Sequence, residues 1–66
     1  MNEELQLLND YRQAISKILE KGTLTTRFIT TPEGNFILVS TIIDGIEHTI
    51  KNEDLLLAVI QLSNEI

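Results

Sequence analysis

Residues 36–43 read FILVSTII, and this stretch decides how the rest of the chain is arranged. Phe36 and Leu38 point to one side of an extended strand, and the intervening Ile37 points to the other. A strand that is apolar on both sides is typical of the middle of a sheet that is covered on both faces. The sequence therefore predicts a sheet with residues 36–43 at its centre.

A turn signal stands on each side of this strand. Residues 31–35 (TPEGN) predict a type I turn with a bulge, because proline presets the second turn position and Gly34 supplies positive φ. The pair Asp44-Gly45 predicts a type I′ hairpin turn. The neighbouring segments are β-branched or alternate between apolar and polar residues, as strands do. The expected sheet is a three-stranded antiparallel meander of residues 23–31, 36–43 and 46–51.

Helical patterns precede and follow the sheet. In residues 3–21, apolar side chains recur at three- and four-residue steps, and Gly22 is expected as a left-handed residue that ends this helix. In residues 53–64, apolar side chains cover more than one side, and Asn52 is expected to cap the first turn. Residues 1–66 are therefore predicted to form a single α+β domain of element order α-β-β-β-α.

The two turn types fix the strand register, and the register sorts the side chains by face. If Thr31 pairs with Asn35, Ile29 falls on the face that the helices are expected to cover. The opposite face then carries both phenylalanines of the chain. Its apolar residues form the candidate interface: Leu24, Phe28, Phe36, Leu38 and Ile42.

Two arrangements are open for this second face. In one, a helix covers each face of the sheet and buries every apolar residue within the chain. In the other, the second face or the surplus apolar side of the last helix meets another chain, since soluble monomers rarely expose large contiguous apolar patches. A chain of 66 residues has a marginal core, yet 42% of these residues are hydrophobic. The sequence therefore favours a homo-oligomer, most simply a two-fold dimer.

Composition argues against several classes of function. The net charge is −5 and the five basic residues are scattered, so a basic protein is a more natural partner than nucleic acid. No apolar run approaches the roughly 20 residues that span a bilayer, and the acidic N-terminus does not read as a signal peptide. Without cysteine, the chain has no disulfides or thiolate metal sites, and a reducing compartment, the cytoplasm, is expected.

No catalytic, metal-binding or cofactor-binding motif stands out, and the chain is not expected to be an enzyme. His48 is the only histidine and is interpreted as structural, because a catalytic histidine needs an orienting carboxylate. The acidic pairs at residues 3–4 and 53–54 are interpreted as partners of helix dipoles. One polar row is a candidate lining for a small ligand: Thr25, Arg27, Thr41 and His48.

In layout, a small acidic chain with a helix, a three-stranded meander and a helix resembles some phage-encoded inhibitors, including certain anti-CRISPR proteins. The resemblance covers the element order of the whole chain and no residue motif. It implies a protein that binds and blocks a larger host defence protein. The predicted function is therefore a small, acidic, non-enzymatic protein-interaction module. The alternative is a homo-oligomer that binds or sequesters a small-molecule ligand at its interface.

Overall fold

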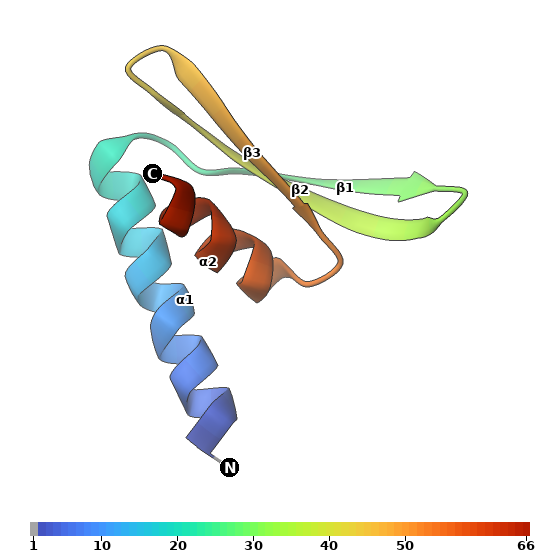
Figure 1. The fold of residues 1–66 in the computed structure, drawn as a ribbon, viewed down its shortest axis with the longest axis horizontal. Helices are drawn as coiled ribbons and strands as arrows, with labels where there is room; N and C mark the ends of the chain where they lie inside the picture. The colour runs from blue at the N-terminus through green and yellow to red at the C-terminus, as the bar shows by residue number, and fades with distance from the viewer. Residues whose placement is uncertain (1) are drawn as a thin grey trace.

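The computed structural model describes residues 2–66, so Met1, the first residue of the predicted domain, lies outside them. The chain forms two helices and three strands: α1 (Asn2–Lys21), β1 (Thr25–Thr31), β2 (Gly34–Ile43), β3 (Ile46–Asn52) and α2 (Leu55–Glu65) (Figure 1). The strands form one antiparallel sheet in the order β1-β2-β3. The predicted α+β fold and its element order are confirmed, and no predicted boundary is more than two residues from the observed one.

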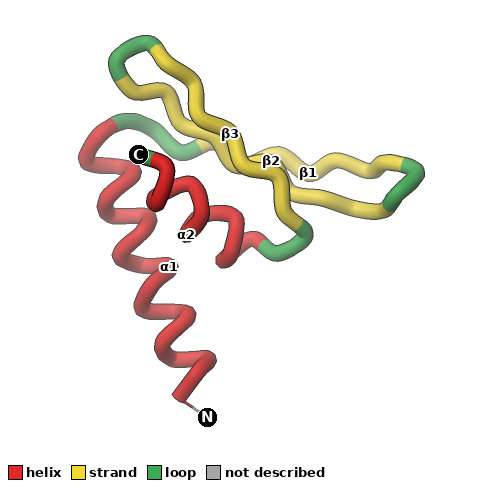
Figure 2. The backbone as a smooth tube through the Cα atoms, viewed as in Figure 1, coloured by secondary structure: helices red, strands yellow, loops and turns green. Residues whose placement is uncertain are grey.

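Helix α2 lies between α1 and the sheet. It packs against β2 and β3 on one side and against α1 on the other, whereas α1 makes little contact with the strands. Both helices therefore lie on the same side of the sheet (Figures 1 and 2). The arrangement in which one helix covers each face is wrong.

The core lies where α2 meets its two neighbours. Its buried apolar residues come from both helices and from the central strand: Ala14, Ile18, Val39, Ala58, Val59 and Leu62. A helix with apolar neighbours on two sides is buried on two sides. The apolar surplus that the sequence shows on the last helix is thus largely used within the chain.

Two lysines of α1 connect it to the end of α2. Lys17 Nζ donates a hydrogen bond to the backbone oxygen of Ser63 at 2.8 Å, and Lys21 Nζ donates to that of Ile66 at 3.3 Å. The last carbonyl groups of a helix accept no hydrogen bond from within the helix, and they carry partial negative charge. The lysines therefore stabilise the end of α2 and fix its position against α1.

Helix α2 begins two residues later than predicted, because its cap is Asp54 and not Asn52. The backbone of Asp54 is extended (φ −113°, ψ 126°), and its Oδ1 accepts a hydrogen bond from the N–H of Leu57 at 3.1 Å. Asn52 Oδ1 accepts from the N–H of Asp54 at 3.0 Å. The side chain of Asn52 thus stabilises the turn before the helix, and the side chain of Asp54 caps the helix.

The hairpin between β1 and β2 differs from the predicted one. Thr31 pairs with Gly34 and not with Asn35. The loop therefore contains only Pro32 and Glu33. The Thr31 hydroxyl accepts from the N–H of Glu33 and donates to the oxygen of Gly34, both at 3.2 Å. The favoured two-residue turns need positive φ at their first position, which proline cannot adopt, so the sequence pointed to a longer loop.

This shift of one residue moves every side chain of β1 to the opposite face. Phe28 lies opposite Ile37, on the side of the helices. Ile29 lies opposite Phe36, on the side away from them. Leu24 packs against the core. The predicted placement of Leu24 and Phe28 on the face away from the helices is therefore wrong.

The hairpin between β2 and β3 is the predicted one. Asp44 and Gly45 have φ values of 53° and 79°, and a type I′ turn requires positive φ at both positions. Ile43 pairs with Ile46, as the sequence predicts. The predicted pairing of β2 with β3 is therefore confirmed along both strands.

Replacing Gly45 by valine should lower the free energy of unfolding by about 1–3 kcal/mol, because a β-branched side chain is strained at positive φ. Gly45→Asn is the matched control, since asparagine tolerates this conformation and a Cβ at Gly45 meets no atom within 4 Å. Urea denaturation monitored by circular dichroism measures both variants. Equal midpoints for the two would contradict the turn assignment.

Gly22 ends α1 for a different reason from the predicted one. Gly34 and Gly45 are the glycines with positive φ, so Gly22 is not in the left-handed conformation. A Cβ on Gly22 would lie 2.5 Å from the carbonyl oxygen of Ile42 and 3.0 Å from Oγ1 of Thr41. Glycine is needed here because the end of α1 approaches the backbone of β2 closely.

Gly22→Ala should therefore destabilise the protein by about 1–3 kcal/mol, as overpacking of a close contact does. The neighbouring exposed residue provides the control, and Thr23→Ala should change the unfolding midpoint little. If both variants unfold at the wild-type urea concentration, the close approach of α1 to β2 does not exist in solution.

Candidate functional site

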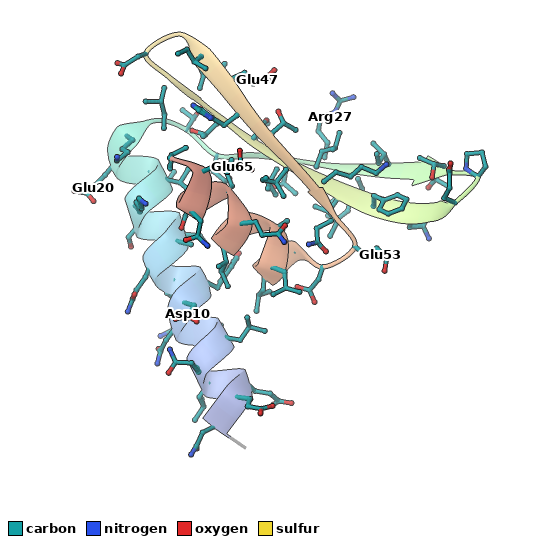
Figure 3. The ribbon with its side chains drawn as sticks, viewed as in Figure 1. Asp10, Glu20, Arg27, Glu47, Glu53 and Glu65 are labelled. Carbon is teal, nitrogen blue, oxygen red and sulfur yellow. The ribbon has the colours of Figure 1, made fainter. Side chains whose placement is uncertain are left out.

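The face of the sheet that points away from the helices is not covered by any part of residues 2–66 (Figures 1 and 2). We call it the open face. Figure 3 shows Arg27 and Glu47 on this side of the sheet. The strand pairing places four apolar residues on it (Ile29, Phe36, Leu38 and Ile42), four hydroxyl residues (Thr25, Thr31, Ser40 and Thr49) and three charged residues (Arg27, Glu47 and Lys51).

One end of the open face combines cations with apolar side chains. Leu38 pairs with Arg27 on one side and with Lys51 on the other, so the three residues form one row across the sheet. Lys51 Nζ lies 4.3 Å from the centroid of the Phe36 ring, within the range of a cation–π interaction. This end is therefore both apolar and positively charged.

The other end of the open face is apolar and acidic. Ile42 pairs with Glu47, four residues along β2 from Leu38, which corresponds to about 13 Å of strand. Ile42 is 55% exposed. Two cations and one acid thus lie on the open face, although the whole chain has a net charge of −5. The expectation of a basic partner, which rests on the net charge of the whole chain, does not follow from the charges of this face.

The chain also has more surface than a compact monomer of its size. Its accessible surface is 4761 Å², whereas about 4,200 Å² is typical of a 7.5 kDa monomer. Its radius of gyration is 12.3 Å, against about 11 Å for a compact domain of this length. The cause is visible in Figure 1, where both hairpins and the first half of α1 extend beyond the core.

The structure brings together part of the predicted interface. Phe36, Leu38 and Ile42 share the open face, whereas Leu24 and Phe28 lie on the side of the helices. Sequence reasoning missed Ile29, which the observed register places beside Phe36. Only the length of the first hairpin loop could have revealed it. The role of these residues in binding stays a prediction.

The four candidate ligand-lining residues do not form one row. Thr41 and His48 face each other on the side of the helices. Thr25 and Arg27 lie on the open face, because the observed register turns β1 over. Thr41 is only 1% exposed, so it cannot line a surface open to solvent. The sheet therefore does not present the polar lining that the sequence suggested.

The hydroxyl of Thr41 is buried and has no hydrogen-bond partner within residues 2–66. It lies next to the position that a Cβ on Gly22 would occupy. A buried hydroxyl without a partner loses its hydration on folding and gains nothing in exchange. Its position makes Thr41 a packing residue of the contact between α1 and β2.

Thr41→Val should consequently raise the free energy of unfolding by about 1 kcal/mol, because it removes the unpaired hydroxyl and keeps the shape of the side chain. The exposed Thr49→Val on the adjacent strand serves as the control and should have a smaller effect. A lower midpoint for Thr41→Val in thermal or urea unfolding would mean that the hydroxyl does form a hydrogen bond.

A shallow groove of about 480 Å³ runs between the two helices. It is lined mostly by polar residues: Asp10, Gln13, Ala14, Lys17, Ile60, Ser63 and Asn64. Lys17 already donates to Ser63 within it. Residues 2–66 contain no group of three or more His, Cys, Asp or Glu side chains placed to hold a metal ion. The groove is therefore a polar surface in which the cation of Lys17 is already hydrogen-bonded.

Neither helix in residues 2–66 is long and apolar enough to cross a membrane. No protein-family model matches the sequence, and comparisons with curated proteins and with solved structures find no match. The function must therefore be inferred from the geometry of the chain, and the open face is its most distinctive surface.

Proposed function

We propose that the protein is a small non-enzymatic interaction module that binds a protein partner through the open face. One observation carries this proposal: both helices pack on the same side of the sheet, which leaves Phe36, Leu38 and Ile42 without a covering layer. A soluble protein rarely leaves such a set of neighbouring apolar side chains uncovered unless another molecule binds there.

The residue types of the open face are those that contribute most to protein interfaces. Aromatic and arginine side chains are enriched among residues whose truncation costs the most affinity. Here Phe36 and Arg27 flank Leu38 at one end of the face. Fully burying an exposed large apolar side chain contributes roughly 1.5–3 kcal/mol before the cost of association is subtracted, and Ile29, Phe36 and Leu38, which are already half-buried, contribute part of that. Four such side chains suffice for the centre of a modest interface.

The charges of the open face indicate the character of the partner. Arg27 and Lys51 lie beside the apolar cluster, so acidic groups on the partner would meet them favourably. The Ser40 and Thr49 hydroxyls between the two ends suit polar contacts. An apolar surface with acidic residues around it fits this face better than a strongly basic one.

Blocking a larger protein is the form of this function that best suits so small a chain. Its groove is shallow and polar, whereas the open face of its sheet carries neighbouring apolar side chains. Such a face acts by covering a surface of its partner. The layout shared with phage-encoded inhibitors supports the same view, with a host defence protein as the target. No observation favours the alternative of a ligand-binding oligomer, since its candidate lining residues lie on opposite faces.

Capture of the partner from the source cell, followed by affinity measurement with the purified pair, tests the proposal. Phe36→Asp and Ile42→Asp each place a charge in the apolar cluster and should weaken binding by about thirtyfold or more. Leu5→Asp is the matched control, because Leu5 is 62% exposed on α1, far from the open face. Circular dichroism confirms that each variant is folded. Equal affinity for all three variants, or loss with Leu5→Asp alone, would overturn the proposal.

A further inference from the structure

Strand β1 is the least protected element of the sheet. It is an edge strand, with β2 on one side and no strand on the other. Neither helix packs against it to any extent, and five of its seven residues are exposed. Every second residue of an edge strand directs its backbone N–H and C=O groups outward without a partner. The free edge of β1 is therefore a template for another strand.

The features that usually prevent pairing at an edge are weak in β1. The strand pairs with β2 without a bulge from Thr25 to Thr31. Pro32 follows the strand and does not interrupt it. Arg27 is its only charged residue. Phe28, at its centre, is 78% exposed, the largest exposed fraction among the large apolar residues of 2–66.

The sequence of β1, TTRFITT, is nearly palindromic about Phe28. We propose that a second copy of this chain pairs with β1 edge to edge, in antiparallel orientation, with a two-fold axis at Phe28. The whole strand then takes part in the pairing. Opposite pairs are Phe28 with Phe28, Arg27 with Ile29, Thr26 with Thr30 and Thr25 with Thr31, each with its counterpart in the second copy.

These pairs are favourable ones for antiparallel strands. Aromatic pairs and threonine pairs directly opposite each other stabilise a sheet relative to alanine pairs. The two Phe28 rings would shield each other on the side of the helices, where Ile37 also lies. This contact gives the exposed aromatic ring a second apolar neighbour besides Ile37 of its own chain.

Arg27 favours this register over the two registers in which the axis is shifted by one residue. Centring the axis one residue earlier would place the two Arg27 side chains directly opposite each other, and like charges in that position are destabilising. Centring it one residue later, at Ile29, would leave Thr25 and Thr26 without partners and pair Phe28 with Thr30. The axis at Phe28 gives the longest overlap without opposing charges.

The resulting dimer has a defined shape. Paired residues of antiparallel strands point to the same face, so an axis through a residue pair stands perpendicular to the sheet. The two copies would form one continuous six-stranded sheet with all four helices on one side. The interface is at the small end of the range for specific complexes, so association in the micromolar range is expected.

The other free edge, β3, is the competing site. Its own symmetric pairing, about Thr49, would place Glu47 opposite Lys51 of the second copy. Two observations favour β1 instead. Lys51 already contacts the ring of Phe36, and α2 covers β3 but not β1. The experiment therefore has to distinguish the two edges.

Sedimentation velocity across the micromolar range gives the first test. The wild-type chain should dimerise reversibly, and Phe28→Lys should weaken the dimer about tenfold or more, because it replaces the central aromatic pair by two opposed cations. Leu19→Lys, at a residue 56% exposed on α1, should leave dimerisation unchanged. A wild-type monomer throughout this range, or an equal effect of the two variants, would overturn the proposal.

Cross-linking gives a test of the register. The chain has no cysteine, so single variants are unambiguous. Thr26→Cys and Thr30→Cys, treated with a short bismaleimide, should cross-link efficiently only when the two variants are mixed, because identical positions lie about 13 Å apart along the paired strands. Preferential cross-linking of Thr49→Cys would assign the dimer to β3 and overturn the proposal. Partner binding through the open face is tested by a different variant, since Phe36 lies on β2 and Phe36→Asp leaves the edge of β1 intact.

Discussion

The position of α2 between α1 and the sheet is the constraint on which the rest of the structure depends. Helix α1 has little contact with the strands, so the part of its apolar stripe that is buried packs against α2, and Leu5 and Leu19 stay exposed. The sheet in turn buries its covered face against the other side of α2. The segment from Leu55 to Asn64 accordingly has no charged residue. Ala58 is fully buried, and its small side chain allows neighbouring elements to approach closely.

The length of α2 explains why so much of the sheet stays exposed. A helix of 11 residues is about 16 Å long, whereas a strand of ten residues extends over about 33 Å. One short helix can therefore cover only the middle of β2. The end of the hairpin between β2 and β3 lies beyond it, which leaves Ile46 61% exposed, and β1 has little contact with α2, which leaves Phe28 78% exposed, even on the side of the helices. Because α1 packs on α2 and not on the sheet, nothing in residues 2–66 covers the other face.

The sequence predicts the elements well because each has a local signal with a physical cause. Positive φ at Asp44 and Gly45 is a property of those two residues, and it sets the pairing of β2 with β3. The register of β1 depends instead on the length of the loop at Pro32, where the Thr31 hydroxyl bonds to Glu33 and Gly34. Residue preferences alone allow both a two-residue loop and a longer one. That single ambiguity decides whether Phe28 or Ile29 belongs to the open face. The placement of both helices on one side of the sheet has no local signal at all.

The two proposed contacts, one through the open face and one through the edge of β1, would be physically linked. In the proposed dimer the two open faces join, and the two Arg27 side chains become diagonal neighbours close to the axis. Their mutual repulsion opposes dimerisation, although salt and side-chain flexibility reduce it. An acidic group of a partner placed at the axis would contact both arginines and remove that repulsion. Partner binding would then strengthen the dimer, and by thermodynamic reciprocity the dimer would bind such a partner more tightly than the single chain does.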